Sequence, residues 1–91
     1  MNTMIDNTLH ELFIASFDYQ TDSERWIKRN AVDDIRWYIQ TGRASTPWLK
    51  ALFKANPQKL LAGIARKGSQ STDDNIRTTT SYLKRYCGFD G

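Results

Sequence analysis

Apolar residues recur along most of this chain at intervals of three and four positions, which is the spacing of an amphipathic α-helix. In the first such segment, residues 5–17, the apolar stripe comprises Ile5, Leu9, Leu12, Phe13, Ser16 and Phe17. The acidic residues of this segment fall off the stripe. We therefore predict a first helix over residues 5–17, followed by a short connection through Asp18 to Gln20.

Residues 21–41 carry the signals of the longest helix. Thr21 and Glu24 match a capping box, in which the hydroxyl of Thr21 accepts from the amide of Glu24 while the carboxylate of Glu24 accepts from the amide of Thr21. The stripe behind it comprises Ile27, Ala31, Val32, Ile35, Tyr38 and Ile39. Thr41 and Gly42 end the segment. We predict a helix of about 19 residues, close to 28 Å long, that serves as the scaffold of the fold.

Two short helices are predicted next, each begun by a capping residue followed by proline. Ser45-Thr46-Pro47 and Asn56-Pro57 both follow this pattern. Because the residue before a proline is driven out of the helical region, the chain must break between Ala55 and Pro57. We expect a helix of about nine residues, a sharp bend and a helix of about eleven. The predicted inner faces are Trp48, Leu49, Leu52 and Phe53 in the first helix, and Leu60, Leu61 and Ile64 in the second.

The last predicted helix starts at Ser71 or Thr72 and ends at Gly88. Asp73 and Asp74 stand in its first turn, where the helix dipole favours negative charge. We predict an inner stripe of Ile76, Thr80, Leu83 and Cys87, with Thr79, Tyr82 and Tyr86 alongside. Three consecutive β-branched threonines, residues 78–80, weaken the helical propensity of this segment.

These segments together predict an all-α fold. With connections of one to six residues, the helices form a compact single domain over residues 1–91, without a linker or a second domain. It comprises about five helices: two long, two short and proline-started, and one C-terminal. A composition of 40% hydrophobic and 25% charged residues is that of a globular chain of this size.

Cysteine content and hydropathy indicate the compartment. Cys87 is the only cysteine, so an internal disulfide framework is excluded, and no apolar run approaches the length of a membrane span. The N-terminus shows no signal-peptide pattern. We expect a reduced, soluble, cytoplasmic protein that does not act at a membrane.

Catalytic chemistry finds little support in the sequence. His10 is the only histidine, and Cys87 falls on an apolar stripe where a buried, inert thiol is the ordinary outcome. The adjacent pairs Asp33-Asp34 and Asp73-Asp74 would point about 100° apart on a helix, away from a shared site. No phosphate-binding loop, metal-ligand spacing or dinucleotide fingerprint is present. We expect no catalytic residues, no metal, no cofactor and no enzymatic activity.

The charge distribution is the strongest functional signal. Residues 1–34 contain seven acids and three bases, whereas residues 35–72 contain seven bases and no acid. The remaining residues, 73–91, contain three of each. This asymmetry indicates either an anionic partner or ion pairing between the two halves of the chain, and the sequence does not separate the two.

Our first hypothesis is a small regulatory protein that binds nucleic acid, since phosphates are the commonest target of a basic surface. The candidate binding residues are Arg43, Lys50, Lys54, Gln58, Lys59, Arg66 and Lys67. The two short helices could form a helix-turn-helix pair with Gln58 and Lys59 near base edges. The match is imperfect, because that motif spends three or four residues on its turn, whereas Asn56 stands almost alone.

The alternative hypothesis is a protein-interaction module, an adaptor or an inhibitor that docks on an acidic partner protein. Trp48 and Phe53 beside Lys50 and Lys54 are residues of the kind that anchor interfaces with a polar rim. Exposure of Trp48 would favour this hypothesis, and burial of Trp48 would favour nucleic-acid binding or a basic surface with no partner.

Overall fold

Five α-helices account for most of residues 3–91, the part of the chain that the computed structural model describes. They are α1 (Thr3–Ala15), α2 (Asp22–Gln40), α3 (Thr46–Lys54), α4 (Pro57–Lys67) and α5 (Thr72–Cys87). No strand occurs in these residues, so the predicted compact all-α fold is confirmed, while the first two residues of the predicted range lie outside the described part. The radius of gyration is 11.9 Å, close to the roughly 12 Å expected for a folded chain of this length.

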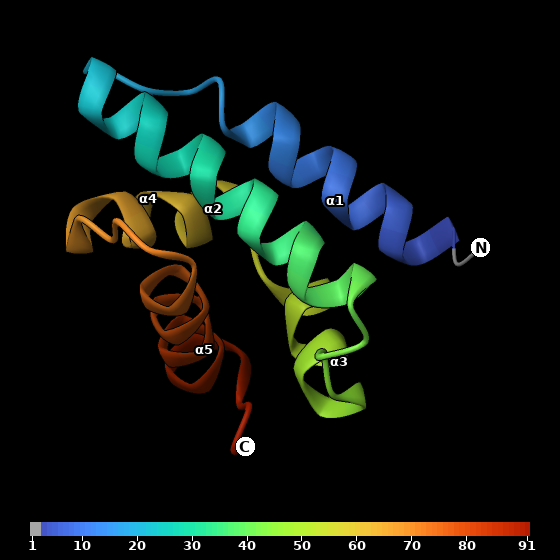
Figure 1. Ribbon diagram of the computed structural model, residues 1–91. Helices are drawn as coiled ribbons and strands as arrows, with labels where there is room; N and C mark the ends of the chain where they lie inside the picture. The colour runs from blue at the N-terminus through green and yellow to red at the C-terminus, as the bar shows by residue number, and fades with distance from the viewer. Residues whose placement is uncertain (1–2) are drawn as a thin grey trace.

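The helices form two layers (Figure 1). Helices α1 and α2 run antiparallel side by side, and α4 packs across α2. Helix α5 contacts α2, α3 and α4, whereas α1 contacts α2, α3 and α4 from the other side. The backbones of α3 and α4 do not approach each other closely, although these helices are consecutive in the chain. The core therefore lies where α1, α2 and α5 enclose the apolar faces of α3 and α4.

Local capping explains why the helices begin where they do. The hydroxyls of Thr21, Ser45 and Ser71 and the amide oxygen of Asn56 each accept a hydrogen bond from the backbone amide three residues later, at 3.1–3.2 Å. The predicted starts of α2 to α5 are confirmed. One detail of the capping box is wrong: the carboxylate of Glu24 accepts from the amide of Gln20 at 3.4 Å rather than from that of Thr21.

The predicted apolar stripe of α1 is partly wrong. Leu9, Leu12 and Ser16 are buried as expected, but Phe13 and Phe17 are 40% and 57% exposed. Helix α1 ends at Ala15, and the amides that follow bond to carbonyls three residues back, which tightens the last turn. The two rings contact each other edge to face, 5.0 Å apart between centroids, outside the core.

A buried lysine holds the connection between α1 and α2. The side chain of Lys28 is buried in α2, and its amino group donates to the carbonyl of Asp18 and pairs with the carboxylate of Glu24 at 3.0 Å. The hydrogen bond from Lys28 lowers the pKa of Glu24 below its ordinary value. The stabilisation from this contact is therefore present above the ordinary carboxyl pKa and is lost as the pH falls through the lowered value.

The buried face of helix α5 consists mostly of polar residues. The buried positions are Asn75, Thr79 and Leu83, so the predicted stripe of Ile76, Thr80, Leu83 and Cys87 is displaced by one position; Ile76, Thr80 and Cys87 are only half-buried. Each residue of the threonine run is hydrogen-bonded. Thr78 bonds to the hydroxyl of Ser69 at 2.9 Å, and Thr79 and Thr80 donate to carbonyls one turn back. These contacts give each hydroxyl of the run a hydrogen-bond partner within the protein.

A polar contact between α2 and α5 fixes the start of α5. The carboxylate of Asp34 accepts from the side-chain amide of Asn75 at 2.5 Å and from the hydroxyl of Thr72 at 3.0 Å. Asn75 is fully buried, so its amide nitrogen needs a partner within the protein. Asp34 supplies that partner, and this explains a carboxylate turned toward the interior beside the exposed Asp33.

We predict that Asp34→Ala lowers the free energy of unfolding by about 1–3 kcal/mol, because it leaves the buried amide of Asn75 without an acceptor. Asp33→Ala is the matched control, since its exposed carboxylate makes only a 3.9 Å ion pair with Arg36 and its loss should cost less than about 0.5 kcal/mol. Urea denaturation measures both. Equal losses in the two variants would show that the Asp34 contact is not structural.

We predict that Ile35→Ala and Leu61→Ala each destabilise the protein by about 2–5 kcal/mol, because both side chains are fully buried and each would leave a cavity. Ile14→Ala is the control, since the side chain of Ile14 is exposed on α1. Thermal and chemical denaturation followed by circular dichroism give the comparison. A change near that of Ile14→Ala would place these side chains outside the core.

Candidate functional site

The candidate binding residues from the sequence are all exposed. These are Arg43, Lys50, Lys54, Gln58, Lys59, Arg66 and Lys67. Within residues 3–91 the side chains of the six from Lys50 to Lys67 make no hydrogen bond or ion pair, and the guanidinium of Arg43 stacks on the ring of Trp37 at 4.6 Å from its centroid. The lysines and arginines of this set are thus available to an anion from solvent.

The ion pairs of the described chain do not join its acidic and basic halves. Over residues 3–91 they are Glu24–Lys28, Asp33–Arg36 and Asp74–Arg77, each within a single helix. Helix α1 packs against α3 and α4, yet no carboxylate of α1 lies within ion-pair distance of their bases. Pairing between the two halves, the second explanation of the charge asymmetry, is therefore absent at contact distance in this part of the chain.

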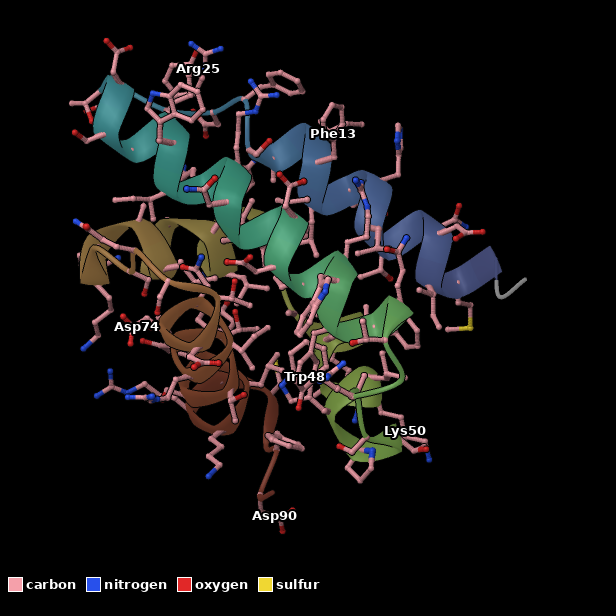
Figure 2. The ribbon with its side chains drawn as sticks, in the orientation of Figure 1. Phe13, Arg25, Trp48, Lys50, Asp74 and Asp90 are labelled. Carbon is pink, nitrogen blue, oxygen red and sulfur yellow. The ribbon has the colours of Figure 1, made fainter. Side chains whose placement is uncertain are left out.

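The geometry of α3 and α4 does not favour the helix-turn-helix expectation. That motif joins its two helices by a turn of three or four residues, whereas α3 and α4 diverge at Asn56 and their backbones do not approach each other closely. Figure 2 shows Lys50 on α3, well apart from Asp74 at the start of α5. The bases of residues 43–67 are distributed along α3, α4 and the segments beside them, rather than gathered on one recognition helix.

Trp48 is not a partner anchor. Its side chain is 2% exposed and lies between α3 and α5 (Figure 2), with the indole NH donating to the hydroxyl of Thr80 at 3.0 Å. Its ring also packs against that of Tyr38 at 5.0 Å between centroids. The periodicity predicts Trp48 on the inner face of α3, and because the side chain is buried there, a partner cannot reach it. Phe53, the second predicted anchor, is half-buried.

A groove between α4 and α5 is a concave basic feature that sequence reasoning missed. It encloses about 390 Å³, within the range of small-ligand sites. Arg66 and Lys67 line it from the end of α4. The residues contributed by α5 are Asp74, Arg77, Thr78, Ser81, Tyr82, Arg85 and Tyr86, and Gly63 completes the α4 wall. Two of the predicted binding residues are therefore brought together with two arginines of another helix.

The groove is positive and carries an aromatic pair. Four cationic side chains face one acid, Asp74, whose pair with Arg77 spans 4.0 Å between two exposed side chains and neutralises little. The rings of Tyr82 and Tyr86 lie 4.7 Å apart at a tilt of 43°. Burial raises the pKa of the Tyr82 phenol, with smaller contributions from Cys87 and Tyr86. The phenol therefore stays protonated at neutral pH and can donate a hydrogen bond.

A helical spacing could have revealed the α5 side of the groove. Arg77, Ser81 and Arg85 follow one another at intervals of four, as do Thr78, Tyr82 and Tyr86, so the two rows form neighbouring stripes on one face. Residues 73–91 are neutral overall, and this hid the arginines from a count of charge by segment. The proximity of this face to α4 is a tertiary property that the sequence does not display.

Exposed apolar side chains gather at a second place, the corner between α1 and α2. Phe13, Phe17 and Trp26 are each at least 40% exposed there, and the guanidinium of Arg25 lies 5.7 Å from the ring centroid of Trp26. Figure 2 shows Phe13 and Arg25 at this corner, far from the Asp74 end of the groove. Nearby Asp18 and Asp22 are acidic, so the corner is not part of the basic surface.

His10 lies on α1 and Cys87 on α5, two helices whose backbones do not approach each other closely. Across residues 3–91 no three histidine, cysteine or acidic side chains are close enough to share a metal ion. In the same residues no helix combines the length and the apolar character needed to cross a membrane.

Comparison with protein-family models, with curated proteins and with solved structures gave no match for this chain. We therefore infer function from the geometry and charge of the residues themselves.

We predict that Gly63→Ala raises the free energy of unfolding by about 0.5–1 kcal/mol, because glycine inside a helix is unfavourable and the new Cβ would lie 3.6 Å from the Tyr82 ring, an ordinary contact distance. Gly68→Ala is the matched substitution with the opposite expected sign. Gly68 caps α4 in the left-handed region at φ 67°, which costs alanine about 1 kcal/mol. Destabilisation by Gly63→Ala would mean that α4 and α5 are closer than described.

Proposed function

We propose that this chain is a small non-enzymatic nucleic-acid-binding protein of regulatory type. It binds phosphates through the basic surface of residues 43–67, which the groove between α4 and α5 extends with Arg77 and Arg85. A helix-turn-helix is not part of this proposal, because the backbones of α3 and α4 do not approach each other closely.

The observation that carries this proposal is the absence of internal partners for the bases. Over the described residues the lysines of α3 and α4 are exposed and unpaired, and the segment from Ile35 to Thr72 has no acid of its own. Such charges add to a positive surface potential. A polyanion gains affinity at that surface because each neutralised phosphate releases condensed counterions.

A protein partner remains the alternative, and burial of Trp48 counts against it. The expected anchor pair is reduced to Phe53, which is half-buried, with Lys50 and Lys54 exposed around it. A single partly exposed ring is less than the cluster of buried anchors on which stable protein interfaces depend. Capture from a lysate with and without nuclease separates the two functions, since nuclease abolishes only an interaction that nucleic acid carries.

We predict that Lys54→Glu combined with Lys59→Glu weakens nucleic-acid binding at least about tenfold near 0.1 M salt, and lowers the slope of log K against log salt by about 2. The reason is that two exposed lysines beside the α3–α4 break no longer meet phosphates. Fluorescence anisotropy with labelled DNA and RNA over a salt series measures both quantities.

The control for this experiment is Arg25→Glu with Arg29→Glu on α2, which changes net charge equally outside residues 43–67. Circular dichroism confirms that each variant folds. Unchanged affinity in the lysine variant, or an equal loss in the arginine variant, would contradict the proposed surface. A wild-type protein that binds neither DNA nor RNA would contradict the proposed function itself.

A further inference from the structure

The α4–α5 groove combines two chemical properties that a phosphate-binding surface alone does not require. Arg66, Lys67, Arg77 and Arg85 supply positive charge from two helices, and Tyr82 with Tyr86 supplies an aromatic wall between them. Phosphate contacts to a duplex need only the charge, because the bases of a duplex are stacked inside it. The aromatic wall therefore favours a ligand that has an exposed planar group.

Tyr86 is placed to stack on such a group. Its side chain is 65% exposed, and its ring contacts that of Tyr82 at 4.7 Å between centroids. Tyr82 is half-buried and packs against the core, so it supports Tyr86 from beneath. The guanidinium of Arg85 lies 5.9 Å from the Tyr86 centroid. An exposed ring held in this way offers a face for a planar ligand.

The hydrophilic wall of the groove suits a nucleotide. The hydroxyl of Thr78 is already bonded to Ser69, but Ser81 is exposed and unbonded within the described residues, so it can contact a sugar or a base. Gly63 has no side chain, so α4 lies close to the ring of Tyr82, which a Cβ at that position would meet at 3.6 Å. With about 390 Å³ available, the groove admits a planar ring beside the cations.

We propose that the α4–α5 groove binds unpaired nucleotides of single-stranded nucleic acid, with a base stacked on Tyr86 and the adjacent phosphates at Arg66, Lys67, Arg77 and Arg85. This inference rests on the proposed function and specifies its ligand. Aromatic rings interleaved with cations are the general means of holding single strands without strict sequence preference. An acidic polypeptide would use the cations and leave the ring without a planar partner.

The test compares Tyr86→Ala with Tyr86→Phe on a pyrimidine single strand of about 12 nucleotides, a length typical of one single-strand site, as DNA and as RNA, and on the matching duplex. We expect Tyr86→Ala to weaken single-strand binding by about 5- to 100-fold while duplex binding is unchanged. Tyr86→Phe should keep wild-type affinity, since phenylalanine retains the stacking face. Phe17→Ala is the control, an exposed ring outside the basic surface that should have no effect.

Two further measurements identify the ligand: a comparison of RNA with DNA strands and a competition with polyglutamate. A preference for the RNA strand over the DNA strand assigns the groove to RNA, and equal affinity assigns it to single strands of either kind. A polyglutamate of similar length should compete poorly, because it has no planar group.

Failure of this inference is distinguishable from failure of the proposed function. If single strand and duplex bind alike and Tyr86→Ala binds as the wild type does, the groove inference is overturned and phosphate binding stands. Competition by polyglutamate as effective as by the strand overturns it as well. If the wild-type protein binds no nucleic acid in any form, the proposed function fails with it.

Discussion

The break in the chain before Pro57 is the constraint on which the arrangement of the helices depends. Asn56 is extended, with ψ of 116°, because the residue before a proline is driven out of the helical region, and Ala55 before it is extended as well, with ψ of 144°. Helices α3 and α4 therefore leave the junction in different directions, and their backbones do not approach each other closely. The space between their apolar faces is closed by α5 on one side and by α1 on the other, which is why α5 touches three helices.

In this position α5 buries a face that is unusual because most of its residues are polar. Its sequence has few apolar residues to bury, so the interface is built from Asn75 and the threonine run, with Leu83 as its one fully buried aliphatic residue. Buried polar groups need hydrogen-bond partners. Asp34 accepts from Asn75, Ser69 bonds to Thr78, and the indole NH of Trp48 donates to Thr80. The buried side-chain oxygen of Asn75 has no partner among the described residues. The same contact buries Trp48, so the packing of α5 decides which aromatic residues remain on the surface.

The surface that results is electrostatically divided. Ion pairs in the described chain stay within single helices, between partners one turn apart. The two exposed pairs, Asp33–Arg36 and Asp74–Arg77, contribute little stability. The bases of α3 and α4 are left for an external anion, and α5 adds two arginines and two tyrosines beside the end of α4. The groove thus arises from the contact between α4 and α5, which no continuous stretch of sequence contains.

The sequence by itself determined the local structure of this protein. The starts of α2, α3, α4 and α5, and the break at Asn56-Pro57, follow from capping side chains and proline, whose effects reach only a few residues. It also determined the charge difference between the halves and the core positions of Ile35, Leu60, Leu61 and Ile64. Only the tertiary structure decided which edge of each apolar stripe is covered, and so exposed Phe13 and Phe17 and buried Asn75 and Thr79. It also decided that Arg66 and Lys67 line one groove with Arg77 and Arg85. The physical reason is that stripe edges and groove walls depend on how neighbouring helices cross, and side-chain periodicity specifies the face of a helix without specifying its neighbour.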